Sequence, residues 1–268
     1  MKNKVVIITG ATSGIGKACA IAFGQAGCKV VIVGRNPERL AATSAELAQL
    51  NIEHLLVEAD VSKETDAARI AEATIKRFGR IDILINNAGI SMRALFEDAE
   101  LDVIRRVMDV NFYGTVYATK FALPYIIAAK GSVIGVSSVA GYRGLPGRTG
   151  YSASKFAMQG FLEALRTELL PKQVHVLVAC PGFTASNIRN TALAANGQAQ
   201  GESPRDEDKM MTAEEVAGQI LKATIYRKRD LIITVQGKFT VLMNKFFPAI
   251  MDKLVFNHMK KEKDSPFK

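Results

Sequence analysis

The stretch VVIITGATSGIG, residues 5–16, joins a run of apolar, mostly β-branched residues to a turn that contains three glycines. The run predicts a buried strand, and the glycines allow the backbone to turn sharply into a helix. A helix N-terminus presents unpaired N–H groups and a partial positive charge, which suit a pyrophosphate. Such a turn can also serve tight packing alone. Its place between a strand and a helix favours dinucleotide binding, although the spacing is G-x-x-x-G-x-G instead of the common G-x-G-x-x-G.

The rest of the chain repeats this order of strand and helix. Short apolar runs predict strands at Val5–Thr9, Lys29–Val33, Glu53–Glu58, Ile81–Asn86, Ser132–Ser137, Val174–Cys180 and Leu231–Val235. Helical patterns occupy Ile15–Ala26, Pro37–Leu50, Lys63–Phe78, Glu100–Ala129, Gly150–Leu170 and Thr212–Tyr226. Near-continuous apolar strands that alternate with helices predict the α/β class, with a doubly wound parallel sheet of the Rossmann type.

The alternation runs through one unit, because no linker rich in Pro, Gly or Ser separates two cores. We therefore expect a single domain over residues 1–268, with a core at about 4–235 and a C-terminal helical tail at 237–268. Ligands of such sheets bind at the carboxyl ends of the strands. The irregular segment Phe183–Met211 falls at that end, where a long loop is commonly a lid.

Composition narrows the class of protein further. The chain has no uncharged apolar run of about 18 residues, as a membrane-spanning helix would need, and it passes from Met1 into a strand without a signal-peptide pattern. We expect a cytoplasmic protein. The three cysteines show no C-x-x-C spacing and are expected to be buried, reduced thiols. The three histidines lie far apart, so no metal site is expected.

The end of the second expected strand, Val33-Gly34-Arg35-Asn36, indicates which dinucleotide binds. NAD sites usually place an acidic residue there to hold the ribose 2′-hydroxyl. This position has no acid, and the guanidinium of Arg35 can bind a 2′-phosphate through paired hydrogen bonds. The prediction is therefore NADP(H) in preference to NAD(H). The alternative is that Arg35 stacks on the adenine as a surface residue and discriminates weakly.

The segment Tyr151-Ser152-Ala153-Ser154-Lys155 places a tyrosine and a lysine one helical turn apart on the same face. A tyrosine with its usual pKa of about 10 is a poor base near neutral pH. A lysine charge about 4 Å away lowers that pKa by up to about three units at an effective dielectric near 20. We therefore expect Tyr151 to act as an acid/base with Lys155 as its electrostatic partner.

Polar residues also follow the ends of the other strands. Asn86-Asn87-Ala88-Gly89 ends the fourth strand, Ser137-Ser138 the fifth and Pro181-Gly182-Phe183-Thr184 the sixth, and Asn111 lies in the helix after the fourth. The joint pattern T-G-x-x-x-G-I-G, N-N-A-G, N, S, Y-x-x-x-K and P-G closely resembles the short-chain dehydrogenase/reductase family over residues 4–235. Within that family, the branch of steroid and lipid ketone reductases is the most similar.

This resemblance implies an oxidoreductase that moves a hydride between NADP(H) and the carbonyl or alcohol carbon of a small molecule. Tyr151 would protonate the carbonyl oxygen or deprotonate the alcohol, and Lys155 would bind the nicotinamide ribose and lower the pKa of Tyr151. Ser138 would hydrogen-bond the substrate oxygen. Asn111 would hold a backbone kink and a water that supplies protons to Lys155, unless its role is purely structural.

The resemblance also implies a set of cofactor contacts. Asp60 and Val61 would frame the adenine, although Asp60 could instead cap the following helix. Asn87 to Gly89 would line the cofactor and brace the sheet, and Pro181 to Thr184 would pack on the nicotinamide. The full set is Gly10, Thr12, Ser13, Gly14, Ile15, Gly16, Arg35, Asp60, Val61, Asn87, Ala88, Gly89, Tyr151, Lys155, Pro181, Gly182, Phe183 and Thr184.

The family commonly forms homodimers or homotetramers through helices that match Glu100–Ala129 and Gly150–Leu170, so such an oligomer is expected. No nucleic-acid recognition module is recognisable, and no nucleic-acid partner is expected. The substrate pocket should be shaped by Ser91 to Phe96, Ala140 to Arg148 and the segment Phe183–Met211.

The tail departs from the family pattern. Apolar residues at helical spacing lie among lysines there, and Pro248 should divide the tail into two short helices. From Lys222 onward the chain has 11 basic and 4 acidic residues, which account for +7 of its net charge of +9. Two interpretations remain open. The apolar stripe packs on the domain or on a partner subunit, or it lies on an anionic membrane surface.

Three functions are compared on this basis. The first is an NADP(H)-dependent carbonyl reductase or alcohol dehydrogenase with an apolar substrate, as in the similar branch. The second is a 3-oxoacyl reductase that acts on a carrier-bound thioester. The third is a non-catalytic dinucleotide-binding regulator or scaffold, against which the joint presence of Ser138, Tyr151 and Lys155 argues.

Overall fold

The structure, a computed structural model, describes residues 1–206 and 210–267. Its parallel strands form one sheet in the order β3-β2-β1-β4-β5-β6-β7. The direction of winding reverses between β1 and β4, which opens a crevice at the carboxyl edge there. The strands are β1 Val5–Thr9, β2 Lys29–Gly34, β3 His54–Glu58, β4 Ile83–Asn86, β5 Ser132–Val136, β6 His175–Cys180 and β7 Asp230–Ile232.

The helices follow the strands in the predicted order. They are α1 Gly14–Gln25, α2 Pro37–Gln49, α3 Glu64–Phe78, α4 Leu101–Met108, α5 Gly114–Ala128, α6 Thr149–Glu168, α7 Ala213–Ile225, α8 Val235–Phe246 and α9 Pro248–Lys260. A π-helical turn, η1 Asp109–Tyr113, joins α4 to α5, and short 3₁₀ turns occupy η2 Val139–Gly141 and η3 Leu170–Lys172.

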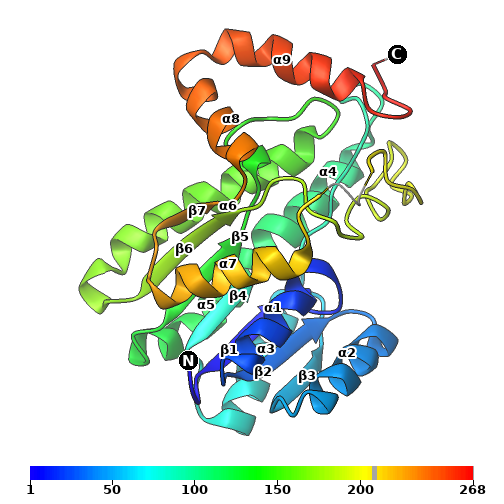
Figure 1. Ribbon diagram of the computed structural model, residues 1–268. Coiled ribbons are helices and arrows are strands. Elements are labelled where there is room, and N and C mark those ends of the chain that lie inside the picture. The colour runs from blue at the N-terminus through cyan, green and yellow to red at the C-terminus, as the bar shows by residue number, and fades with distance from the viewer. Residues whose placement is uncertain (207–209, 268) are drawn as a thin grey trace.

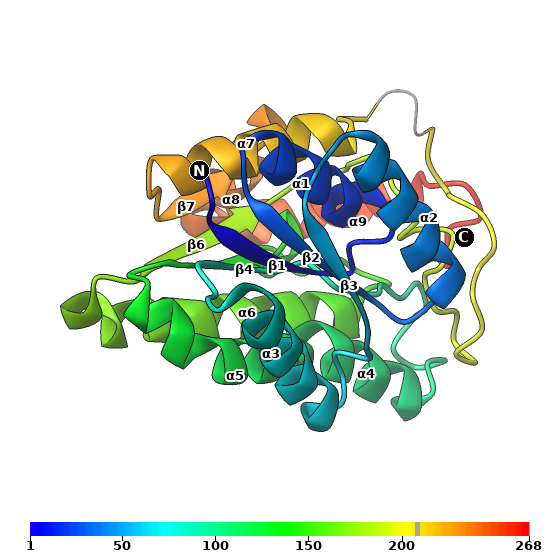
Figure 2. The same ribbon diagram turned by 90° about the horizontal axis from the view of Figure 1, so that it is seen from below.

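The sheet lies between two layers of helices. Helices α1, α2 and α7 cover one face, and α3, α4, α5 and α6 lie on the other (Figures 1 and 2). Alternate strand residues face opposite layers: Val6 and Ile8 pack in the cluster with α1 and α7, and Val5 and Ile7 pack in the cluster with α3 and α6. The doubly wound, Rossmann-type α/β fold predicted from the sequence is confirmed.

Most predicted boundaries lie within one or two residues of those observed, and two elements differ by more. The stretch expected as one helix over residues 100–129 is interrupted by the π-helical turn η1, which the tertiary contacts of Asn111 hold open. The last strand ends at Ile232, short of the expected Val235, because Thr234 accepts a hydrogen bond from the N–H of Gly237 and caps α8. The three cysteines are buried and free, as predicted.

The tail forms two helices divided at Pro248, as predicted, and they stand over the carboxyl edge of the sheet (Figure 1). One face of α9 packs on the protein, where Met251, Val255 and Met259 are buried in a cluster with Leu145. The tail also exposes large apolar residues, namely Val235, Leu242, Phe246, Phe247, Ile250 and Phe256, together with Phe239 and Leu254, which also line the cavity described below. The tail therefore packs on its own domain and keeps an apolar outer surface.

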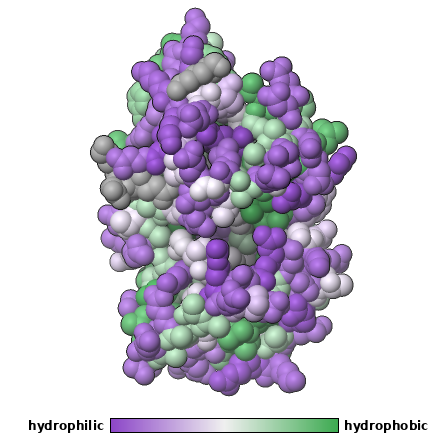
Figure 3. All heavy atoms as spheres, turned by 90° about the vertical axis from the view of Figure 1, so that its right-hand side faces the viewer, coloured by the Kyte–Doolittle hydropathy of each residue, from purple (hydrophilic) through white to green (hydrophobic). Residues whose placement is uncertain are grey.

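A third view shows the side of the molecule on which the C-terminal end lies. Hydrophilic side chains cover most of that side, with smaller apolar areas between them (Figure 3). Within the described part of the chain, no helix combines the length and the apolar character that crossing a membrane requires.

Candidate active site

A cavity of about 800 Å³ lies at the carboxyl edge of the sheet. Its floor comes from the ends of β4, β5 and β6, and its walls come from α6, from the irregular segment after β6 and from α8 and α9. Of the predicted site residues, those that line it are Ile15, Asn87, Gly89, Ser138, Tyr151, Lys155, Pro181, Gly182, Phe183 and Thr184. One cavity therefore gathers the motifs that the sequence places on five separate elements.

The glycine-rich turn lies at one end of this cavity. Gly10 and Gly14 adopt φ values of +65° and +50°, which side chains rarely allow, and a Cβ on Gly16 would lie 2.2 Å from the carbonyl oxygen of Gly10. Asn87 donates to the carbonyl oxygens of Thr9 and Gly10 at 3.0 and 3.1 Å, which ties the turn to β4. Asn87 therefore braces the sheet at this point.

The first turn of α1 keeps its amide donors available. The residue before the helix, Ser13, has an extended backbone and makes no capping hydrogen bond with its side chain. Thr12 packs near Gly34 at the end of β2, where a Cβ would lie 2.7 Å from the Thr12 methyl group. A close backbone approach, uncapped N–H groups and a positive helix end together fit a pyrophosphate.

The residues expected at the adenine end lie farther along the same edge and outside the lining of the cavity. Arg35 follows β2, is exposed, and has its guanidinium 3.7 Å from the carboxylate of Asp60 after β3. Asp60 also accepts hydrogen bonds from the N–H and the hydroxyl of Ser62, at 3.0 and 2.8 Å. Asp60 thus holds the turn after β3 and does not cap α3, whose N-cap is Lys63. Val61 is buried against Gly114.

Arg39 is a second cation at this end that the sequence analysis did not single out. It lies in the first turn of α2, where Asn36 accepts a hydrogen bond from its N–H at 2.7 Å. A cation in the first turn of a helix opposes the helix dipole, which favours anions there. An arginine in this unfavourable position, one turn after Arg35, is the feature of the sequence that could have indicated a second cation at the adenine end.

The centre of the site is a tyrosine and a serine. Tyr151 projects from the first turn of α6, and its hydroxyl lies close enough to that of Ser138, which follows β5, for Ser138 to lower the pKa of Tyr151. Ser138 also accepts a hydrogen bond from the N–H of Ala140 at 3.1 Å, so its hydroxyl is fixed by the 3₁₀ turn η2. Two hydroxyls held side by side can both contact one carbonyl oxygen.

Lys155 lies one turn after Tyr151 and is buried. Its ammonium donates to the carbonyl oxygen of Val136 at 2.9 Å and lies 5.7 Å from the centre of the Tyr151 ring. Burial lowers the pKa of Lys155 to about 8. At that value the ammonium exchanges protons close to neutral pH.

The pKa of Tyr151 differs from the sequence-based expectation. Burial raises it, and the hydrogen bond with Ser138 and the positive charges of Arg148 and Arg189 offset only part of that increase. The sequence argument counted the attraction of a nearby lysine and omitted the desolvation of the phenolate. Because its pKa is raised, Tyr151 is protonated at neutral pH and is suited to donate a proton.

Asn111 is buried in the π-helical turn η1, and both the oxygen and the nitrogen of its side-chain amide make hydrogen bonds. Its amide exchanges two hydrogen bonds with the backbone of Ile90, at 2.8 and 2.9 Å, and donates a third to Ser154 at 2.8 Å. A Cβ on Gly89 would lie 3.2 Å from the Asn111 oxygen and 3.6 Å from the Lys155 ammonium. Asn111 thus fixes the loop after β4 against α6, beside Lys155.

The substrate side of the cavity agrees in part with the predicted segments. Ser91, Ala140, Arg148 and residues of the segment after β6 line it, whereas Phe96 is 61% exposed and does not. Residues 207–209 of the predicted lid lie outside the described residues. The sequence analysis did not foresee the contribution of the tail, which supplies Phe239, Thr240, Met251, Leu254, Val255, His258 and Met259.

Two further polar residues at the site were also missed, Gln159 beneath the cavity lining and Arg189 in it. Gln159 donates to the hydroxyl of Ser137 at 2.9 Å and to the carbonyl oxygen of Ser138 at 3.4 Å. It follows Lys155 by four residues, so the face that carries Tyr151 continues for another turn. Arg189 lines the cavity from the irregular segment and donates to the carbonyl oxygen of Thr184 at 2.8 Å.

Comparison with known proteins places these features in context. A family model described as short chain dehydrogenase matches residues 4–197. The chain is 35% identical over 271 residues to a mouse protein named dehydrogenase/reductase SDR family member 7B, covering 99% of this chain and 84% of that one. It is 40% identical over 200 residues to an Arabidopsis thaliana protein named 11-beta-hydroxysteroid dehydrogenase-like 4A, covering 74% and 67%.

A solved structure gives the same picture of the fold. The crystal structure of a short-chain dehydrogenase/reductase from Burkholderia phymatum in complex with NAD superposes with a TM-score of 0.83. The two sequences are 25% identical, and the match covers 93% of this chain and 95% of the other.

Proposed function

The chain belongs to the short-chain dehydrogenase/reductase family, and from that premise we propose that it reduces a ketone or aldehyde of an apolar small molecule with NADPH. The observation that carries the proposal is that Ser138, Tyr151 and the buried Lys155 line one cavity, which the glycine-rich turn also borders. The family acts on CH–OH and C=O groups with a nicotinamide dinucleotide. The choice of cofactor, substrate and acid/base belongs to the proposal.

Proton transfer in this scheme rests on three residues. Ser138 holds the substrate oxygen, and Tyr151 donates its proton to that oxygen as negative charge develops there. Lys155, whose pKa is about 8, stabilises the resulting phenolate and returns a proton. The bound cofactor supplies the hydride. Because the pKa of Tyr151 is raised, the residue starts protonated, which favours reduction over alcohol oxidation near neutral pH.

The preference for NADPH is supported by charge at the adenine end. No acid ends β2, and Arg35 and Arg39 lie beside the positive N-terminus of α2. The contact between Arg35 and Asp60 is exposed and long, so it is weak and open to competition by a phosphate. Asp60 is the one feature at this end that would favour a ribose 2′-hydroxyl, which makes it the residue to examine if NADH binds well.

An apolar substrate is supported by the residues that line the far half of the cavity. Ile188, Met211, Met251, Leu254 and Val255 are all apolar and come from the irregular segment and α9. Methionine side chains adapt to ligands of varied shape. A bulky carbonyl compound fits this wall better than a small polar one.

The direct test measures NADPH oxidation by absorbance with purified protein and a panel of aliphatic, steroid, retinoid and 3-oxoacyl ketones. Turnover that disappears in Tyr151→Phe, while the variant still binds NADPH, supports the mechanism. A preference for carrier-bound 3-oxoacyl thioesters would replace the proposal with the 3-oxoacyl reductase. Tight NADPH binding without turnover of any carbonyl compound would favour the regulator or scaffold.

A homodimer or homotetramer is part of the proposal. The helices expected at the interface expose large apolar residues, with Leu101 on α4, Tyr125 on α5 and Phe156 on α6. Light scattering after size exclusion measures the mass directly. The variant Phe156→Arg should shift that mass toward the monomer, and an unchanged oligomer would place the interface elsewhere.

The proposed location is the cytoplasm, with the tail resting on an anionic membrane surface. The exposed apolar residues of α8 and α9 support this location, together with Lys238, Lys245 and Lys253, which are exposed among them. Co-sedimentation with anionic and neutral vesicles tests it. Replacement of Phe246 and Phe247 by serine should reduce recovery with anionic vesicles, and equal recovery would refute the membrane role.

A further inference from the structure

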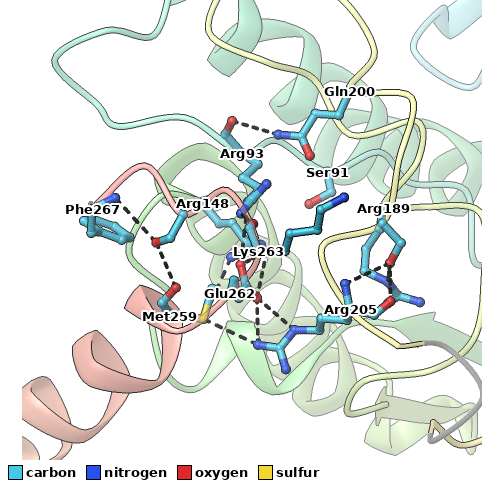
Figure 4. Close-up of polar contacts among 12 residues, drawn as sticks. Ser91, Arg93, Arg148, Arg189, Gln200, Arg205, Met259, Glu262, Lys263 and Phe267 are labelled. Atoms are coloured by element: carbon cyan, nitrogen blue, oxygen red, sulfur yellow. Dashed lines mark hydrogen bonds and ion pairs between the residues drawn. The ribbon is translucent and has the colours of Figure 1, made fainter.

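A buried carboxylate lies at the edge of the cavity, among three arginines. Glu262, just after α9, contacts Arg148 at 3.0 Å and Arg205 at 2.7 Å, and its carboxylate lies 3.6 Å from the guanidinium of Arg93 (Figure 4). Arg93 comes from the loop after β4, Arg148 precedes α6, and Arg205 belongs to the irregular segment. Three separate segments thus direct a guanidinium at one point.

The three guanidinium groups carry more positive charge than the single carboxylate neutralises. Among the described residues, all three arginines pair with Glu262, so the four side chains carry a net charge of +2. The Nε of Arg93 is buried and has no hydrogen-bond partner within the described part of the chain. This Nε is the atom that lies 3.6 Å from Glu262, so one carboxylate shared by three guanidinium groups leaves it without the hydrogen bond that a further anionic oxygen can supply.

The group borders the proposed reaction centre. Arg148 lines the cavity, and its charge acts on the Tyr151 hydroxyl. The guanidinium of Arg205 lies 3.7 Å from the centre of the Phe183 ring, and Phe183 lines the cavity too. Of the three arginines, Arg148 lines the cavity, so a ligand with its carbonyl at Tyr151 meets this group at Arg148.

Glu262 reaches the arginines from a short terminal segment. Besides Glu262, this segment is held by a hydrogen bond from Arg93 to the carbonyl oxygen of Lys263 and by one from Ser265 to the carbonyl oxygen of Met259. Lys263 itself is exposed and pairs with Glu202 at the surface. The ring of Phe267 packs against Phe256 and the buried cluster of α9, so the segment has contacts that do not depend on the carboxylate when another anion competes for the arginines.

We propose that Arg93, Arg148 and Arg205 bind an anionic group, a phosphate or a carboxylate, of the apolar carbonyl substrate. Glu262 occupies this site until the substrate displaces it. The inference rests on the proposed function, because it assigns the charge of the substrate in that same cavity. The competing interpretation is that Glu262 is only a buried ion pair that fastens the tail.

The test measures binding, with no turnover involved. Calorimetric titration of the full-length protein compares octyl phosphate, octanoate and octan-1-ol, which share one chain and differ in the head group. The variant Glu262→Gln removes the internal competitor and should tighten binding of octyl phosphate or octanoate by about tenfold or more. Binding of octan-1-ol should not change, and whichever anion binds more tightly identifies the head group.

A matched control separates competition from loosening of the tail. Asp252 on α9 accepts a hydrogen bond from Arg143 at 2.5 Å and is otherwise exposed, so Asp252→Asn releases a tail contact away from the three arginines. This variant should leave the affinity for all three compounds unchanged. In the otherwise native chain, Arg205→Met should abolish the preference for the anionic compounds, which keeps the test informative if Glu262→Gln does not fold.

The proposal is overturned if octyl phosphate and octanoate bind no tighter than octan-1-ol in both the native chain and Glu262→Gln. Anion binding that tightens equally in Glu262→Gln and Asp252→Asn would also overturn it, because Glu262 would then serve only to hold the tail in place. Preferential anion binding without turnover of any ketone would refute the proposed function alone. Turnover of neutral ketones without an anion preference would refute this inference alone.

Discussion

Replacement of Lys155 by methionine should raise the stability of the folded protein near neutral pH while it abolishes catalysis. Burial lowers the pKa of Lys155 from 10.5 to about 8, so keeping the ammonium charged in the folded state costs about 3 kcal/mol at pH 7. Methionine avoids that cost but loses the hydrogen bond to Val136, which contributes about 1 kcal/mol. The net gain of about 2 kcal/mol corresponds to a Tm increase of roughly 4–8 °C.

The stability cost of the buried Lys155 ammonium should fall as the pH rises. Below pH 8 both the folded and the unfolded chain hold the Lys155 proton, and the cost is fully present. Between pH 8 and 10.5 the folded chain has released the proton while the unfolded chain retains it, so stability rises with pH. By about pH 9.5 roughly 2 kcal/mol of the cost is relieved, and the advantage of methionine should vanish.

Thermal unfolding of the native chain and Lys155→Met, followed by circular dichroism at about pH 7 and about pH 9.5, measures both effects. Lys120 is exposed on α5, and Lys120→Met is a matched control whose stability should stay within about 0.5 kcal/mol of the native chain. The reasoning is refuted if Lys155→Met is the less stable protein at neutral pH. It is also refuted if the difference from the native chain is the same at both pH values.

Three further substitutions test other parts of the site. Asn111→Ala removes three hydrogen bonds from a buried turn and should lower Tm by roughly 5–12 °C, whereas a change under about 2 °C would show that the turn does not depend on it. Gly16→Ala places a Cβ 2.2 Å from the Gly10 carbonyl oxygen and should abolish NADPH binding in a titration, while Gly160→Ala, with nothing within 4 Å, should not. Arg35→Gln should weaken NADPH binding by about ten- to hundredfold and leave NADH within about twofold, and equal losses would mean that Arg35 does not bind the 2′-phosphate.

The sequence was sufficient to predict the sheet and its order of elements, because each strand is a near-continuous apolar run and each helix has its own period. It was also sufficient to predict that Tyr151 and Lys155 share a face of α6, since that follows from helical spacing. Pro248 divided the tail as expected, because proline cannot continue the hydrogen bonds of a preceding helix. These features depend on neighbours in the chain.

What could not be predicted depends on distant contacts. The π-helical turn at Asn111 is set by hydrogen bonds to Ile90, 21 residues earlier. The raised pKa of Tyr151 reflects burial against residues of other segments, among them Met92 and Leu193, which spacing does not reveal. Glu262 and Arg148 are 114 residues apart, and neither stands in a motif, so nothing local to either residue indicated their contact.

The division of the cavity between two kinds of segment has an evolutionary consequence. The glycine-rich turn, Ser138, Tyr151 and Lys155 all lie within residues 4–197, the part that the family model matches, whereas α8 and α9 lie beyond it. Residues of these two helices line the cavity, so substitutions there would change its wall and leave the residues at the strand ends in place. Descendants of this chain can therefore acquire new substrates through the tail while inheriting the chemistry unchanged.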